Sequence, residues 1–128
     1  SVRDGDLVMG ALFVVNAVGE IVDEDGSVLA GPQLEPGERR EDLIEWMRAG
    51  NTTIGVIATN ATLSKPDARR LAEVANDAVD EAIRPAHTLF DGDVVFTLAT
   101  KQVDAAYGDV AALVEEAATT AVRRSVRR

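Results

Sequence analysis

Continuous apolar runs alternate along this chain with stretches in which alanine recurs every three or four residues. This pattern constrains the fold more than any other feature of the sequence. Leu7–Asn16 is a continuous apolar run with β-branched residues, which predicts a strand buried on both faces. The stretches Thr52–Thr59 and Asp93–Lys101 predict two further strands. A helical pattern follows each of these two, so the order of elements predicts an α/β layered sandwich.

Both helices are predicted from capping signals and apolar spacing. Ser64 is suited to cap the first helix, Pro66 lies in its first turn, and Pro85 requires the helix to end by Arg84. The second helix is expected from Asp104 to about Arg124. Small apolar residues recur in both at spacings of three and four, which suits close packing on a sheet. They are Ala68, Leu71, Ala72, Ala75, Ala78, Val79 and Ala82 in the first helix, and Val110, Leu113, Val114, Ala117, Ala121 and Val122 in the second.

Two segments separate the first two long strands. Glu20–Val22 and Ser27–Leu29 flank Asp25-Gly26, a pair that predicts a hairpin turn. The following stretch, Pro32–Gly50, is rich in Pro, Gly and charged residues and holds one short predicted helix around Arg40–Arg48. A loop of this length within one domain is uncommon and invites a functional interpretation.

Composition excludes several classes of partner and site. The net charge of −9 disfavours nucleic acid, and no apolar run approaches the roughly 18 residues of a membrane span. The absence of cysteine fits a reducing compartment, so we expect a cytoplasmic protein. No initiator Met is present and a strand begins almost at once, as expected of a fragment or a processed chain. One histidine and no cysteine disfavour a zinc site, and we expect neither metal nor cofactor.

Familiar catalytic patterns are poorly represented. A Ser-His-Asp triad would depend on His87, whose position beside Pro and Thr favours a structural hydrogen-bonding role. The stretch Gly50-Asn51-Thr52-Thr53 has neither the spacing nor the Lys of a phosphate-binding loop.

A nucleophile that carries its own base is the remaining possibility. A threonine at a chain terminus has an α-amine with a pKa near 8, which can accept the proton of its own hydroxyl. Cleavage between Asn51 and Thr52 would create such a terminus, at the end of the long linker. Attack of the Thr52 hydroxyl on the Asn51 carbonyl, followed by hydrolysis of the ester, would accomplish this cleavage.

Carboxylates and an oxyanion donor for this chemistry are available. Asp91 and Asp93 flank a glycine at the start of the third strand, close enough to act as a pair, although from the local sequence alone a β-turn before the strand is favoured. Asn16, at the end of the first strand, is a candidate oxyanion donor or simply a turn residue. Their co-occurrence with Thr52 carries more weight than any one of them.

Three segments, "GNTTIGVIATNATLSK", "RPAHTLFDGDVVFTLAT" and "GALFVVNAVGE", together resemble the self-processing L-aminopeptidase/D-Ala-esterase (DmpA) family. The resemblance covers essentially the whole chain and is greatest to the nylon-oligomer hydrolase (NylC) branch. It implies autocleavage between Asn51 and Thr52, Thr52 as nucleophile with its free amine as base, and Asn16 stabilising the oxyanion. Asp91 and Asp93 match the acidic pair that orients the amine and hydroxyl, where some members carry Ser and Glu.

The resemblance also implies an architecture. The expected fold is a four-layer α/β/β/α sandwich of the DmpA and ornithine acetyltransferase type, of which this chain is the C-terminal portion. Residues 1–51, with the processing linker 31–51, would end one subunit and residues 52–128 would form the other. Family members are considerably longer, so partners would include the other subunit, the missing N-terminal region and further copies in a tetramer or larger homo-oligomer.

Three functional hypotheses follow. The leading one is a self-cleaving aminopeptidase or amidase acting on N-terminal amino acids, short peptides or related oligoamides. An acyltransferase of the ornithine acetyltransferase type would instead transfer acetyl groups to an amine. A non-enzymatic oligomerisation module would have kept the fold and lost processing.

Overall fold

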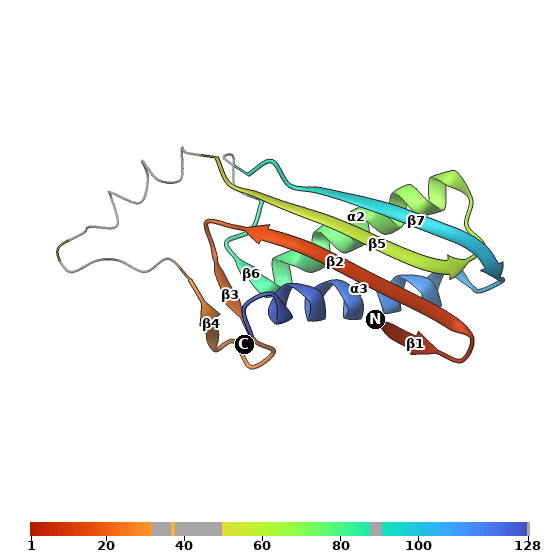
Figure 1. Ribbon diagram of the computed structural model, residues 1–128, viewed down its shortest axis with the longest axis horizontal. Helices are drawn as coiled ribbons and strands as arrows, with labels where there is room; N and C mark the ends of the chain where they lie inside the picture. The colour runs from red at the N-terminus through yellow and green to blue at the C-terminus, as the bar shows by residue number, and fades with distance from the viewer. Residues whose placement is uncertain (32–36, 38–49, 88–90, 128) are drawn as a thin grey trace.

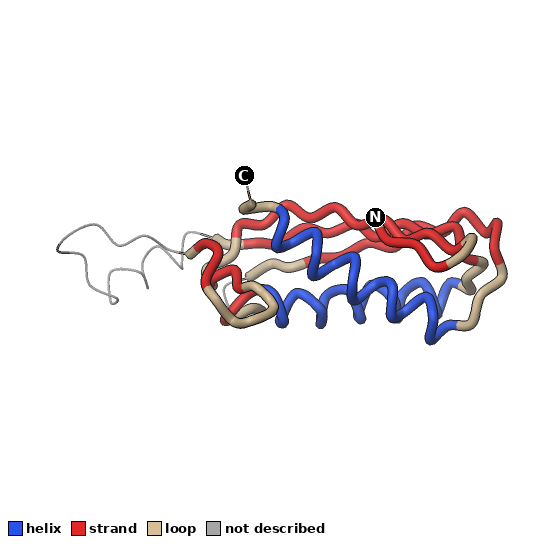
Figure 2. Tube along the Cα trace, turned by 90° about the horizontal axis from the view of Figure 1, so that it is seen from below, coloured by secondary structure: helices blue, strands red, loops and turns tan. Residues whose placement is uncertain are grey.

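The computed structural model describes residues 1–31, 37, 50–87 and 91–127. Within these ranges, one four-stranded sheet carries two helices on a single face (Figure 1, Figure 2). The α/β class predicted from the sequence is confirmed. The strands lie in the order β1 (Val2–Asp4), β2 (Leu7–Asn16), β5 (Thr52–Ala61) and β7 (Val94–Val103). β2 is antiparallel to β1 and β5, whereas β5 and β7 are parallel.

A second, smaller sheet confirms the predicted hairpin. β3 (Glu20–Val22) pairs with β4 (Val28–Ala30), one residue later than predicted for the second strand. Gly26 adopts a φ of 83°, the left-handed conformation that glycine allows in a tight turn. The third strand of this sheet is β6 (Ile83–Arg84), which continues directly from the preceding helix.

The helices follow the sequence prediction closely. α2 (Lys65–Ala82) begins after Ser64, whose hydroxyl accepts a hydrogen bond from the Asp67 main-chain nitrogen at 3.2 Å. α3 (Tyr107–Arg124) starts three residues later than predicted and ends as expected. Among the described residues, no helix combines the length and the apolar character needed to cross a membrane. Small side chains let both helices lie close to the sheet and to each other, and those buried are Ala75, Ala78, Ala82, Ala117 and Ala118.

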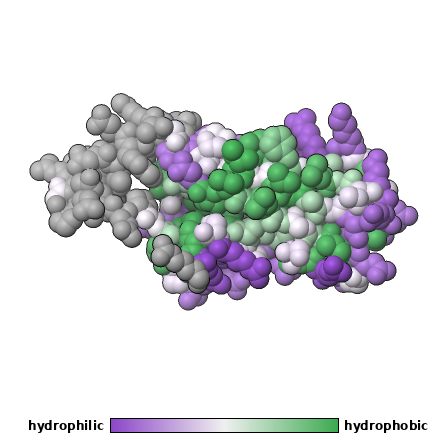
Figure 3. All heavy atoms as spheres, viewed as in Figure 1, coloured by the Kyte–Doolittle hydropathy of each residue, from purple (hydrophilic) through white to green (hydrophobic). Residues whose placement is uncertain are grey.

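The prediction that the Leu7–Asn16 strand is buried on both faces is not met within the described residues. Side chains alternate across a strand, and only the face under α2 and α3 is covered. On the other face Leu12 is 70% exposed and Phe96 is 57% exposed. Figure 3 shows the resulting apolar surface, which we call the open face; its large exposed side chains are Leu12, Val14, Ile54, Val94, Phe96 and Leu98.

A close contact sets the register between β2 and β5. Phe13 lies opposite Gly55, and a Cβ at Gly55 would meet the Phe13 ring at 2.3 Å. A side chain here would cost on the order of 1–3 kcal/mol, as overpacked cores do. The same register continues to the end of the pair and brings Asn16 opposite Thr52.

The predicted short helix around Arg40–Arg48 lies outside the described residues, as does most of the predicted linker 31–51.

Candidate active site

The predicted site residues meet at one end of the large sheet, where β2 ends and β5 and β7 begin (Figure 1). Asn16 is the antiparallel partner of Thr52. Asn51 forms a parallel bridge with Asp91 just before β5 and β7 start. Because parallel strands begin side by side, the residues entering β7 lie next to the residues entering β5. The fold therefore joins two segments that are forty residues apart in sequence.

The peptide bond between Asn51 and Thr52 sits within this junction. The Thr52 hydroxyl donates to the Asn51 carbonyl oxygen at 2.6 Å. The Gly92 main-chain nitrogen donates to the same oxygen at 3.0 Å. Two donors on one carbonyl polarise it, and negative charge that develops on this oxygen would meet an N–H already in place.

The backbone of Gly92 lies close to the Thr52 side chain. A Cβ at this position would lie 3.2 Å from the Thr52 hydroxyl oxygen. The glycine therefore leaves room for the hydroxyl and brings its own N–H to the neighbouring carbonyl.

Asp93 is held at both of its carboxylate oxygens. Its Oδ1 accepts a hydrogen bond from the Thr53 main-chain nitrogen at 2.7 Å. Its Oδ2 lies 2.6 Å from Nδ1 of His87, and the carboxyl side chain is only 9% exposed. One carboxylate thus connects the residue after the candidate nucleophile to the histidine.

His87 is anchored on the other side by α2. Its Nε2 lies 2.9 Å from the main-chain carbonyl oxygen of Asn76 and 3.4 Å from a carboxylate oxygen of Asp80. Burial alone would lower the pKa of His87. The hydrogen bonds with Asn76 and Asp93, and the charges of Asp80 and Asp93, outweigh burial and raise that pKa above its usual value.

The structure brings the predicted site residues together and places two further residues beside them, Gly92 and His87. The sequence pattern indicated only a spacer between two acids at Gly92 and a structural residue outside the site at His87. His87 does form hydrogen bonds as predicted, and one of them reaches Asp93. The described donors to the Asn51 carbonyl oxygen are the Thr52 hydroxyl and the Gly92 main-chain nitrogen, whereas Asn16 lies across from Thr52 on the neighbouring strand. The parallel β5–β7 pairing that aligns Gly92 with Asn51 leaves no signature in residue spacing.

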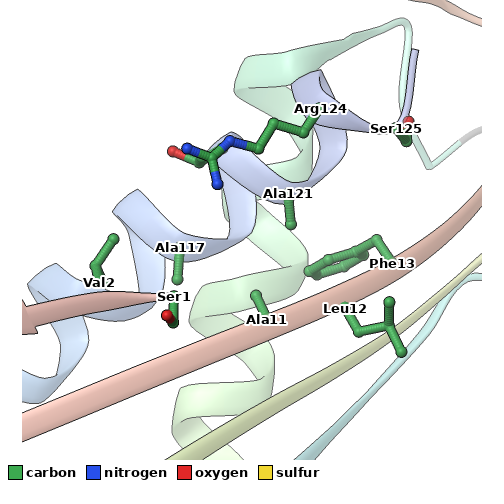
Figure 4. Close-up of a pocket in the computed structure, with 10 residues that line it drawn as sticks. Ser1, Val2, Ala11, Leu12, Phe13, Ala117, Ala121, Arg124 and Ser125 are labelled. Carbon is green, nitrogen blue, oxygen red and sulfur yellow. The ribbon is translucent and has the colours of Figure 1, made fainter. Parts of the chain in front are cut away.

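Two hollows lie near the sheet. One, of about 330 Å³, borders Asp93 and is otherwise lined mainly by α2 residues such as Glu73 and Asn76. The other, of about 280 Å³, lies between β2 and the C-terminal half of α3, where Phe13 faces Ala121 (Figure 4). None of the predicted site residues lines the second hollow. In the part of the chain that the structure describes, no three His, Cys, Asp or Glu side chains gather as metal ligands would.

The profile of peptidase family S58 matches residues 1–127 of this sequence. The chain belongs to peptidase family S58, and the resemblance to the DmpA family is confirmed.

Individual relatives agree with this assignment. An uncharacterized aminopeptidase of Mycobacterium leprae is 44% identical over 108 residues, covering 76% of this chain and 30% of the relative. A 6-aminohexanoate-oligomer endohydrolase of Paenarthrobacter ureafaciens is 33% identical over 114 residues, covering 80% of this chain and 32% of the relative. A putative NylC-analogous protein of an Agromyces strain is 33% identical over 114 residues, covering 80% of this chain and 37% of the relative. The chain spans about a third of the length of the curated relatives it matches.

Proposed function

We propose that this chain is part of a self-cleaving amide hydrolase whose nucleophile is Thr52, freed as a chain terminus by cleavage after Asn51. The observation that carries the proposal is the position of the Thr52 hydroxyl, 2.6 Å from the Asn51 carbonyl oxygen. The Gly92 N–H on the same oxygen adds an oxyanion donor at the bond to be cut.

Cleavage would proceed in two steps. The Thr52 oxygen bonds to the Asn51 carbonyl carbon, the bond from that carbon to the Thr52 nitrogen breaks, and the nitrogen takes up the hydroxyl proton. The product is an ester between Asn51 and the Thr52 side chain. Water then hydrolyses this ester, leaving a carboxylate on Asn51 and a free amine and hydroxyl on Thr52.

The freed residue would then act on substrates. Its amine accepts the hydroxyl proton while the oxygen attacks an amide carbonyl, and the resulting ammonium protonates the departing amine. Water hydrolyses the acyl-enzyme and regenerates Thr52. We assign Asp93 and Asp91 to orienting the amine and hydroxyl, and Asn16 to the substrate oxyanion. Asn16 suits this role because it faces Thr52 across the β2–β5 pair.

The substrates that fit this chemistry are short peptides and related oligoamides. Relatives described as an aminopeptidase and as a 6-aminohexanoate-oligomer endohydrolase support this class. We further propose that residues 1–51 and 52–128 stay associated after cleavage, and that the protein works in the cytoplasm as a homo-oligomer.

Mass spectrometry of the purified protein under denaturing conditions tests the cleavage directly. We expect two fragments divided between Asn51 and Thr52, with Edman sequencing of the new terminus giving Thr-Thr-Ile-Gly. Recovery of one peptide spanning residues 51 and 52 would contradict the proposal. Aminoacyl anilides and 6-aminohexanoate oligomers then separate the two substrate classes.

Gly92→Ala is expected to slow cleavage by about tenfold to a hundredfold, because its methyl group would crowd the Thr52 hydroxyl at 3.2 Å. The measurement is the time course of fragment formation on denaturing gels. Gly108→Ala is the matched control, since a Cβ there meets nothing within 4 Å. Equal rates in both variants would show that Gly92 does not set the geometry.

We also propose that a second sheet, contributed by other parts of the complete protein, packs on the open face and completes the four-layer sandwich. Two of the four expected layers, one sheet and its helices, lie in the described residues. The relatives are about three times as long, which provides residues for the rest. By strand alternation Thr52 and Asn16 share the open face with Ile54 and Val14, so the covering sheet would also border the substrate.

A charge on the open face tests this packing. In protein made from the complete gene, Phe96→Glu is expected to lower the melting temperature and the yield of soluble protein, because it would bury an unpaired carboxylate. Gln102→Glu adds the same charge at an exposed polar position of the same strand and is expected to be neutral. Full stability of the Phe96→Glu protein would indicate that the face stays in water.

A further inference from the structure

His87 connects α2 to the start of β5 through a single carboxylate. Its Nδ1 meets Oδ2 of Asp93, while Oδ1 of Asp93 receives the main-chain N–H of Thr53. Thr53 directly follows the proposed nucleophile. The path from the histidine to the backbone beside Thr52 therefore consists of two short hydrogen bonds.

The partners of the imidazole ring determine its hydrogens. The Asn76 carbonyl oxygen can only accept, so Nε2 must carry a hydrogen. The neutral ring would then have a bare Nδ1 facing the carboxylate of Asp93, and two acceptors would oppose each other at 2.6 Å. A second hydrogen on Nδ1 removes this conflict and makes the contact a charge-assisted pair.

Charges around the ring also favour the imidazolium form, with a hydrogen on both ring nitrogens. Asp80 approaches from α2 and Asp93 approaches from the segment before β7, and among the described residues these are the charged groups in contact with the ring. The ring is only 25% exposed, so these carboxylates are partly shielded from solvent. The raised pKa of His87 agrees with this arrangement.

The backbone conformation of His87 indicates that its side chain is held in one specific position. His87 has a φ of 50°, in the left-handed region that few residues other than glycine adopt. Such conformations persist where the surrounding contacts hold them, and they concentrate at functional sites. The ring contacts with Asn76 and Asp93 hold this one.

We propose that His87 is a positioning residue, whose imidazolium ion holds Asp93 so that the other carboxylate oxygen fixes the Thr53 main chain and thereby the Thr52 nucleophile. This inference rests on the proposed function of Thr52. We call this His87–Asp93–Thr53 contact the clamp, and because it requires the charged ring it is held below the raised pKa of His87. It is lost as the pH rises through the pKa of His87.

Replacement of His87 by glutamine tests the clamp. Glutamine carries no charge, and both of its donor hydrogens sit on a single nitrogen, so it does not bridge Asp93 to Asn76 as the two ring nitrogens do. We expect cleavage after Asn51 to slow by about tenfold to a hundredfold at neutral pH, with kcat of the processed enzyme falling and KM little changed. The alkaline decline in cleavage rate that His87 produces in the parent protein should be absent in the variant. Glu81→Gln removes a neighbouring exposed charge and serves as the control.

A double-mutant cycle with Asp93→Asn separates positioning from general destabilisation. If His87 acts through Asp93, the two effects on cleavage will not multiply in the double variant. Fully multiplicative effects would overturn the inference, as would a neutral ring at pH 7 in nitrogen-detected NMR of the parent protein. Spectra of His87→Gln assign the His87 signals.

Hydrogen exchange distinguishes failure of this inference from failure of the proposed function. Its readout is the Thr53 N–H, which Asp93 protects in the folded protein and which His87→Gln should expose. An uncleaved parent protein with this exchange effect would refute the nucleophile but keep the clamp. A cleaved parent protein with unchanged rates, pH profile and exchange in the variant would refute the clamp alone.

Discussion

Thr52→Ala is expected to yield one uncut chain with no amide hydrolysis. The substitution removes the oxygen that contacts the Asn51 carbonyl and leaves the main chain as it is. Both cleavage and turnover depend on that oxygen in the proposed mechanism, so both should fall below detection. Denaturing mass spectrometry and anilide hydrolysis give the two readouts.

Two substitutions complete this experiment. Thr52→Ser keeps a hydroxyl and should still cleave, more slowly because serine lacks the methyl group that restricts its side-chain rotamer. Thr53→Val keeps the buried β-branched shape and the N–H that contacts Asp93 while removing the neighbouring hydroxyl, so it should cleave normally. Cleavage in Thr52→Ala, or its loss in Thr53→Val, would assign the chemistry to another group.

Asp93→Asn should slow cleavage and turnover by about a hundredfold to a thousandfold, the range seen when a preorganised polar group is removed from a reacting centre. The amide has a single oxygen, which can face either the Thr53 N–H or the ring of His87, and its NH₂ then faces the other partner. The charge that holds both partners is lost in either orientation. Time courses of cleavage and steady-state kcat report the effect.

An exposed acid at the far end of β7 is the control for this experiment. Asp104→Asn removes the same charge from the chain at a position remote from the junction and should leave the rates unchanged. Melting temperatures of both variants must be compared first. A rate loss in Asp93→Asn that simply follows a loss of folded protein would count against an orienting role.

Much of the local structure was accessible from the sequence because short-range rules decide it. The strand Leu7–Asn16 has the predicted bounds, since hydrophobicity and β-branching continue to its turn. Ser64 caps α2 as its side-chain chemistry demands, and the helix ends just before Pro85.

The remainder depended on contacts that span the chain. The open face could not be predicted from the sequence. A strand covered on both faces by its own chain and a strand covered on only one can have the same continuous apolar run. Gly92 reaches the Asn51 carbonyl only through the parallel alignment of β5 and β7. His87 contacts Asp93 from a backbone position with positive φ, a conformation that the sequence around it does not predict.

The proposed cleavage after Asn51 would have a consequence for how the protein folds and assembles. The first piece supplies β1 and β2 but neither described helix, while β5, β7, α2 and α3 belong to the second. Met9 and Phe13 of the first piece share one core with Leu71 and Val114 of the second. Folding would therefore have to precede the proposed cleavage, as a unimolecular event. After such a cleavage the two pieces would form a heterodimer, whose recovery from denaturation would depend on concentration.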